Sequence, residues 1–352
     1  MMSNPAQPDS QVVIIAGMHR SGTSLTASIL QQAGVFIGDE LLGTAVSNPK
    51  GHFEDRDFLT LHIDILTALG LSSEGWLTTE QLDVPEKLWA RAQALCDRRQ
   101  QTHALWGWKE PRTTLFLDFW KQRLPQAKVV LPYRSPWAVI DSLFTRGDAA
   151  FAHHPNFAIA VWLTYNRAAL DFYQRYPDDC FLFHCDVLKA DEAGFIEKLR
   201  HKFALPLTAP EQPLFDPAVM HNQVNDTHRS TLLAHHFPET LEVYAALQQA
   251  ADLPTSQTWQ APVASEADEA MYQAWMLEDW RANSHCRREK QQLKLEMQQQ
   301  QERFEAELQA VQAMRDHWQN TVASMEVNRF WQLRNAWVSL KTALKGSSTK
   351  PE

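Results

Sequence analysis

The sequence predicts an α/β fold in which helices cover both faces of a mostly parallel sheet, with a long helical extension after it. Short apolar runs alternate with helical patterns over the first two thirds of the chain, and polar motifs directly follow several of the runs. Strands that alternate with helices form parallel sheets, so these observations predict three layers. Residues 266–345 contain neither proline nor glycine, which favours an unbroken helix.

The expected elements alternate regularly along the chain. The apolar runs expected as strands are 12–16, 104–108, 129–133 and 181–185. The stretches expected as helices are 24–33, 58–69, 86–99, 114–123, 137–145 and 158–176. Ligands of such sheets bind at the carboxyl ends of the strands. Four polar segments fall at these ends: 17–22, 109–112, 133–136 and Asp186.

The composition is that of an ordinary globular protein and excludes several classes. The 352 residues are 44% hydrophobic and 21% charged, with a net charge of −9 that disfavours nucleic-acid binding. The four cysteines form no CxxC pair, so we expect neither a metal site nor disulfides. The polar N-terminus resembles no signal peptide, and no apolar run reaches the roughly 18 residues of a spanning helix. We therefore expect a cytoplasmic protein.

Shifts in composition predict five segments. The α/β domain is expected at 12–252, after a disordered N-terminus at 1–11. Two prolines and several small polar residues mark 253–265 as a linker. A helical, coiled-coil-like tail at 266–345 and a disordered end at 346–352 complete the chain.

The first part of the tail has the pattern of an imperfect coiled coil. Residues 287–312 contain five basic residues and five glutamates, as expected of a solvated helix. Apolar residues recur every seventh position, at Met297, Phe304, Val311, Trp318 and Met325. The companion positions are mixed, because Leu293 and Met314 are apolar whereas Gln300 and Glu307 are not. We expect self-association through 287–325; the alternative is a single helix packed on its own domain.

The last stretch, 329–345, is amphipathic. Its apolar face comprises Phe330, Leu333, Trp337, Leu340 and Leu344, with Arg329, Arg334, Lys341 and Lys345 beside it. Such a face suits a partner groove or an anionic membrane surface, which would place the protein peripherally at the inner membrane face. The alternative is that the face packs back on the α/β domain. The segment "RFWQLRNAWVSLK" resembles one found after coiled coils in bacterial cell-surface glycan enzymes.

The segment "VVIIAGMHRSGTSL", residues 12–25, predicts a phosphate-binding loop between a strand and a helix. Gly17 and Gly22 permit tight backbone geometry, and the following helix offers free amides and a positive dipole end. Thr23 stands where a nucleoside triphosphatase carries its lysine, so ATP hydrolysis is disfavoured. Arg20 supplies positive charge instead. The hydroxyl donors are Ser21, Thr23 and Ser24, and His19 also lies in the loop.

Two motifs together resemble the sulfotransferases that use 3′-phosphoadenosine 5′-phosphosulfate (PAPS). The core from Arg20 to Thr23 resembles the family's 5′-phosphosulfate loop. The segment "YRSPWAVIDS" places Ser142 eight residues after Arg134, as in the family's 3′-phosphate motif. The resemblance implies a P-loop-like fold, PAPS as cosubstrate, no metal, and nucleotide contacts from residues 17 and 19–24 together with Arg134 and Ser142.

Two further segments are similar to bacterial members of this family. They are "NPKGHFED", residues 48–55, and "WGWKEPRT", residues 106–113. The second places Lys109 at a strand end that faces the nucleotide; the alternative is a structural ion pair of Lys109 and Arg112 with Glu110. The glycine-rich closing segment and the histidine base of cytosolic members have no visible counterpart.

The resemblance implies sulfuryl transfer to a hydroxyl or amine, with a cell-surface glycan or its precursor as the expected acceptor. Arg20 and Lys109 would stabilise the charge of the leaving group. Glu54 is the expected base; alternatively it caps the next helix or pairs with Arg56. Reserve candidates are His19, His52 and Asp55. The competing functions are a small-molecule kinase and an inactive nucleotide-binding module whose tail recruits partners.

Overall fold

The computed structural model describes residues 10–43, 51–79, 82–215, 227–255, 268–327 and 329–346. The chain divides into two compact units, Met1–Ser265 and Glu266–Glu352, which we call the α/β unit and the tail. Most of the two segments expected to be disordered, most of the expected linker and the first part of "NPKGHFED" lie outside the described residues; Gln11 begins the first strand and Gly346 ends the last helix.

The α/β unit is built on a four-stranded parallel sheet with the order β2-β1-β3-β4. Its strands are β1 (Gln11–Ile15), β2 (Leu105–Lys109), β3 (Lys128–Tyr133) and β4 (Cys180–His184). The central strand β1 pairs with β2 and β3, and the register aligns Val13 with Gly107 and Lys128. All three pairings are parallel, so the strand ends that precede the polar motifs meet at one edge. The predicted fold class is confirmed.

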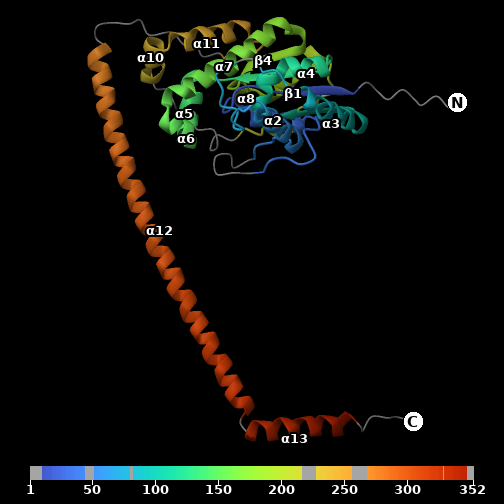
Figure 1. Ribbon diagram of the computed structural model, residues 1–352, viewed down its shortest axis with the longest axis vertical. Coiled ribbons are helices and arrows are strands. Elements are labelled where there is room, and N and C mark those ends of the chain that lie inside the picture. Colours follow the sequence, from blue (N-terminus) through green and yellow to red (C-terminus); the bar gives the residue numbers. More distant parts are fainter. Residues whose placement is uncertain are drawn as a thin grey trace, which may run out of the picture. The chain divides into compact units, whose positions relative to one another are not determined.

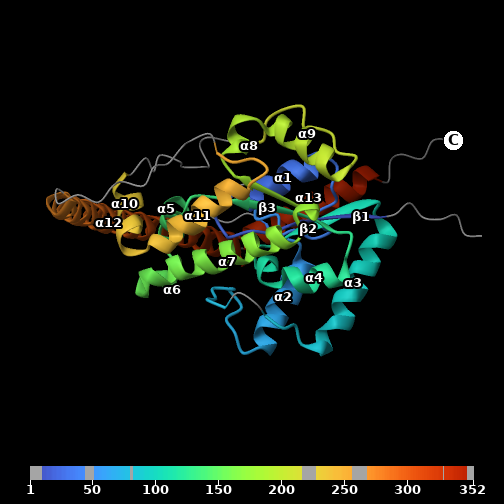
Figure 2. The ribbon, with the colours of Figure 1, turned by 90° about the horizontal axis from the view of Figure 1, so that it is seen from above.

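Helices cover both faces of this sheet (Figure 1). Figure 2 shows α1 (Thr23–Gln32), α8 (Val187–Ala190) and α9 (Glu192–Phe203) on one face. The opposite face carries α2 (Arg56–Ala68), α3 (Trp89–Thr102), α4 (Leu117–Arg123) and α7 (Pro155–Arg175). The other helical elements are α5 (Pro136–Arg146), α6 (Ala149–His153), α10 (Thr227–His236), α11 (Pro238–Ala250) and the 3-10 turns Glu86–Leu88, Pro111–Phe116 and Pro177–Asp179.

Strand β1 contributes side chains to the hydrophobic cores on both faces of the sheet, because its side chains alternate between the two faces. Val13 and Ile15 pack with the apolar residues of α1 and α9. Val12 and Ile14 pack on the other side, with the aromatic residues beneath α2 and α4. A strand buried on both faces reads as a continuous apolar run, which explains the sequence of this segment. On the second side Phe58 stacks on Trp108, with ring centroids 3.9 Å apart.

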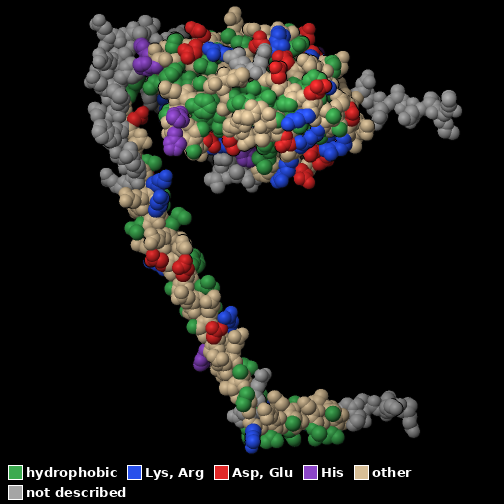
Figure 3. Space-filling view, viewed as in Figure 1, with side chains coloured by type: hydrophobic (Ala, Val, Ile, Leu, Met, Phe, Trp, Pro, Cys, Tyr) green, Lys and Arg blue, Asp and Glu red, His purple; other side chains and the backbone are tan. Residues whose placement is uncertain are grey.

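The tail consists of α12 (Asp268–Val327) and α13 (Arg329–Gly346). Figure 3 shows hydrophobic side chains along both helices, and many of the large ones are exposed. Among the described helices, none is both long and apolar enough to cross a membrane. The role predicted for 329–345, as a tether to a partner or an anionic surface, stays a prediction.

Candidate functional site

The loop after β1 has the tight geometry that its two glycines allow. Gly17 has a φ of +127°, and a Cβ there would lie 2.7 Å from the carbonyl oxygen of Pro132 on β3. Gly22 has a φ of +86°, and a Cβ there would lie 2.8 Å from the Cβ of Cys185. Both positions therefore require glycine. The loop lies directly against the ends of β3 and β4.

The N-terminus of α1 presents polar groups at this loop. Its N-cap residue is Gly22, which has no side chain to accept from the first amides of the helix. The Ser21 hydroxyl is fully buried and has no hydrogen-bond partner among the described residues. A buried hydroxyl without a partner is costly, and an anion at the helix N-terminus would supply both an acceptor and a favourable charge.

Arg20 joins the loop to the second motif, which lies more than a hundred residues away in the sequence. It adopts a left-handed backbone, with a φ of 66°, and its Nε donates to the Ser142 Oγ at 2.8 Å. The Arg134 guanidinium donates to the carbonyl oxygen of Arg20 at 3.2 Å. Burial lowers the pKa of Arg20, and the charges of Arg146 and Arg134 lower it further. The three arginine side chains thus form a crowded cationic edge that favours an anion.

Lys109 and Glu54 form a buried ion pair at the same edge of the sheet. The Lys109 Nζ donates to the Glu54 Oε1 at 2.8 Å and to the carbonyl oxygen of His52 at 2.8 Å. The Ser24 hydroxyl of α1 donates to that same carbonyl at 3.1 Å. The segment that carries Glu54 is thereby attached both to the end of β2 and to the first turn of α1.

Among the described contacts, Glu54 neither caps α2 nor pairs with Arg56. The N-cap of α2 is Asp55, whose carboxylate accepts from the Asp57 amide at 2.9 Å. Asp55 also forms a buried ion pair with Arg99 at 2.9 Å, and burial raises its pKa to about 6. Asp55 therefore has a structural role, because it caps α2 and binds α3 through Arg99. The partner of Glu54 is Lys109.

The alternative interpretation of Lys109 and Arg112, an ion pair with Glu110, holds for Arg112 and not for Lys109. Arg112 donates to the Glu110 Oε1 at 2.7 Å, and His62 contacts the Oε2 at 2.7 Å. The Trp120 indole donates to the His62 Nε2 at 3.0 Å, so the His62 proton resides on Nδ1 and points to Glu110. Burial would raise the pKa of Glu110, but Arg112 and His62 outweigh it and lower that pKa. This buried chain fixes the turn that follows Lys109.

His19 lies in the loop as a neutral, aromatic-packed side chain. Its ring lies 4.6 Å from the ring of Trp76 and 5.8 Å from that of Tyr165. Burial lowers its pKa well below the ordinary value, and the charge of Arg112 lowers it further. Its Nε2 has no hydrogen-bond partner among the described residues.

Two residues at this edge were missed by the sequence analysis. Thr114 accepts from the Gly17 amide at 2.7 Å and so holds the loop from the side of β2. Arg146 lies over the Trp76 ring at 5.7 Å, and its positive charge lowers the pKa of Arg20 and of His19. Its position four residues after Ser142 on α5, hence on the same helix face, was the available signal.

His184, Cys185 and Asp186 place potential metal ligands within 4.8 Å of one another after β4. Their contacts explain them without a metal. The His184 Nδ1 accepts from the Asp186 amide at 3.2 Å, and its Nε2 contacts the Tyr244 hydroxyl at 3.3 Å. Asp186 pairs with Lys189. These residues build the turn on which Gly22 rests.

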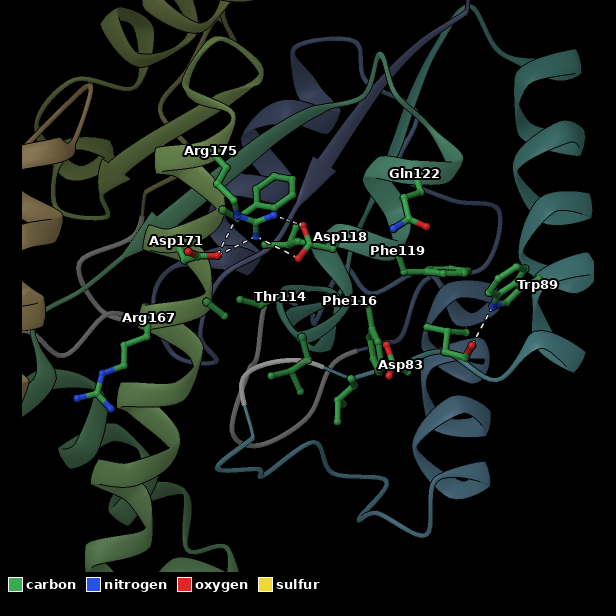
Figure 4. Close-up of a pocket in the computed structure, with 16 residues that line it drawn as sticks. Asp83, Trp89, Thr114, Phe116, Asp118, Phe119, Gln122, Arg167, Asp171 and Arg175 are labelled. Atoms are coloured by element: carbon green, nitrogen blue, oxygen red, sulfur yellow. Dashed lines mark hydrogen bonds and ion pairs between the residues drawn. The ribbon is translucent and has the colours of Figure 1, made fainter.

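A cavity of about 560 Å³ lies between the Pro111–Phe116 turn, α4 and α7. Figure 4 shows Arg175 pointing toward Asp118 and Asp171, so these charges compensate one another. Thr114 also lines the cavity, and it connects the cavity to the phosphate loop. Apart from Thr114, the lining residues belong to none of the contacts that hold this loop.

The sequence that carries this site matches the pattern of a known protein family. Residues 12–209, more than half of the chain, match the pattern described as the sulfotransferase family. The chain belongs to the sulfotransferase family. The match contains the loop, Lys109, Arg134 and Ser142, and family membership supports sulfotransferase activity.

Solved sulfotransferase structures are similar to this chain at low sequence identity. The sulfotransferase domain of the Synechococcus PCC 7002 olefin synthase is 20% identical, covering 74% of this chain and 94% of that one, with a TM-score of 0.36. STF9 from Mycobacterium avium is 14% identical, covering 72% and 79%, with a TM-score of 0.45. The sulfotransferase domain of the curacin biosynthetic pathway is 15% identical, covering 70% and 100%, with a TM-score of 0.39. No curated protein matches the chain.

Proposed function

We propose that this sulfotransferase moves a sulfuryl group from PAPS to a hydroxyl or amine acceptor, with a cell-surface glycan or its precursor as the acceptor class. One observation carries the choice of donor. The Arg20 side chain donates to Ser142 while Arg134 donates to the Arg20 carbonyl, so the two segments that we assign to phosphate binding meet at one edge of the sheet. A nucleotide with phosphates at both its 3′ and 5′ positions needs two such motifs.

The donor set at this edge fits that nucleotide. The amides at the N-terminus of α1 and the hydroxyls of Ser21, Thr23 and Ser24 would hold the 5′-phosphosulfate. Arg134 and Ser142 would hold the 3′-phosphate, since a guanidinium offers a planar fork to phosphate oxygens. The buried Ser21 hydroxyl, which has no protein acceptor among the described residues, supports this assignment. PAPS would supply an activated sulfuryl group.

The chain's own residues would provide charge stabilisation and proton transfer. Lys109 and Arg20 place positive charge at the edge where the leaving group becomes negative. Glu54 would accept the proton of the acceptor group. Its ion pair with Lys109 orients the carboxylate and keeps base and cation within 2.8 Å of each other. Asp55 pairs with Arg99 and caps α2, whereas the partner of Glu54 is Lys109, the other residue proposed for the reaction.

A transfer assay with sulfur-labelled PAPS against a panel of glycans, lipids and phenols tests this function. We expect label on at least one hydroxylated acceptor, and loss of transfer in Lys109→Ala. The matched control is Lys87→Ala, because Lys87 is exposed on a surface turn. Magnesium-dependent phosphate transfer from ATP would instead indicate a kinase. Nucleotide binding without any transfer would indicate an inactive binding module.

A further inference from the structure

Helix α12 exposes a row of large side chains along one side of its C-terminal half. The row consists of Phe304, Leu308, Val311, Arg315, Trp318, Val322 and Met325. Its six apolar members are between 43% and 63% exposed. Helices in water owe most of their stability to packing of an apolar face, so a helix of 60 residues with this row uncovered lacks that stabilisation.

The spacing of the row is that of a coiled coil. Consecutive members follow at steps of four, three, four, three, four and three residues. Steps that average 3.5 residues keep a stripe facing one partner helix over several turns. In this row the apolar companions of the heptad positions are Leu308 and Val322, and the row does not include Leu293 and Met314. With these companions, six of the seven row positions are apolar.

The exposed area of the row matches the needs of a helix pair. At these exposed fractions, and with roughly 150–250 Å² per large side chain, the row presents on the order of 600 Å² per helix. Complete burial of two such rows would remove at most about 1,200 Å² from water, the lower end of the range for specific interfaces. A dimer held by this row alone therefore needs the whole row in the interface.

The exception in the row is Arg315, which stands near its middle. Its guanidinium donates to the carboxylate of Asp316 on the same helix at 2.8 Å, so its charge is compensated beside the row. A single polar residue at a core position lowers the stability of a coiled coil but fixes its register. Pairing with an identical helix places this residue at a defined level in both chains.

We propose that α12 pairs with the α12 of a second copy of this chain through this row, and that the protein is a dimer. An identical helix is the occupant because it brings the same 3.5-residue period, the same length of row and the same polar position. A two-fold interface of this kind uses one surface on both subunits.

Sedimentation equilibrium of the full chain at micromolar concentration tests the proposal. We expect twice the chain mass for the wild type. The double variant Leu308→Glu/Trp318→Glu places two charges in the interface, and we expect its dimer to weaken by at least about 100-fold. Conversely, Arg315→Leu should tighten the dimer by about tenfold or more.

The matched control is Ala306→Glu/Ala313→Glu, which adds the same charges at exposed positions off the row. This control should remain a dimer. Circular dichroism and thermal unfolding establish that each variant keeps its folded α/β unit. A monomeric wild type overturns the proposal, as does a row variant that stays dimeric. Equal dissociation of the row and control variants also overturns it, because the effect would then not depend on the row.

Discussion

Phe58 on α2 and Phe304 on α12 are the same residue type in the same kind of element, with opposite environments. Phe58 is fully buried and stacked on Trp108, whereas Phe304 is 63% exposed. The α/β unit encloses its apolar faces between helices and sheet, and leaves polar groups buried at the loop edge. The tail leaves its apolar rows uncovered. Within one chain, then, the buried polar groups are the basis of the proposed nucleotide site, and the exposed apolar row is the basis of the proposed dimer.

The largest effect that sharpens this comparison is expected at the polar edge. Glu54→Gln keeps the size of the side chain but removes the capacity to accept a proton, so turnover should fall by roughly 10²–10⁴. Nucleotide affinity, measured by titration calorimetry, should stay near the wild-type value. The control is Glu74→Gln, at an exposed position. Near-normal turnover of Glu54→Gln would transfer the role of base to another group.

The next effect compares the two phenylalanines directly. Phe58→Ala leaves a cavity beside Trp108 and should reduce the free energy of unfolding of the α/β unit by about 3–5 kcal/mol. Phe304→Ala should change that free energy by less than about 0.5 kcal/mol, since it removes no buried contact of the unit. Denaturant unfolding followed by tryptophan fluorescence measures both. Equal losses would contradict the division into two units.

A smaller effect is expected from pH. Burial lowers the pKa of His184 from 6.5 to about 4. Below pH 6.5 His184 binds a proton in the unfolded chain but not in the folded chain. The contribution of the neutral His184 to the free energy of unfolding is therefore complete above pH 6.5 and declines as the pH falls toward 4. The loss approaches about 3 kcal/mol. His184→Asn should flatten thermal stability over this range, whereas His201→Asn, on the surface of α9, should not.

The smallest effect should follow removal of the tail. Truncation after Ser265 should leave the melting temperature of the α/β unit within about 2 °C and nucleotide affinity within about twofold. The same truncation should abolish dimerisation, and sedimentation with anionic vesicles if 329–345 is a tether. Unfolding of the truncated chain would show that the tail belongs to the core.

The strands and the phosphate loop were predictable because their signals are local. The four apolar runs match the observed strands to within one residue, and the glycines of the loop stand where positive φ is required. Periodicity and turn chemistry depend on neighbours in sequence, so one chain suffices to read them.

The pairings at the site were not predictable from local signals. Lys109 forms an ion pair with Glu54, Arg20 donates a hydrogen bond to Ser142, and Asp55 rather than Glu54 caps α2. The first two pairings depend on how the strands bring distant segments together, and sequence spacing carries no such information. The cap is local, because the Asp55 carboxylate accepts from the Asp57 amide. The ion pair with Glu110, the alternative considered for Lys109 and Arg112, forms with Arg112 alone, because Lys109 pairs with the distant Glu54.

The central claim, that the loop and the Arg134 motif hold the two ends of one nucleotide, is tested most directly by Arg134→Ala. Titration calorimetry should compare 3′,5′-bisphosphoadenosine with adenosine 5′-phosphosulfate, which lacks the 3′-phosphate. Loss of a charged hydrogen bond should weaken binding of the bisphosphate roughly ten- to a hundredfold, and binding of the phosphosulfate far less. Equal weakening of both ligands would contradict the assignment of Arg134 to the 3′-phosphate.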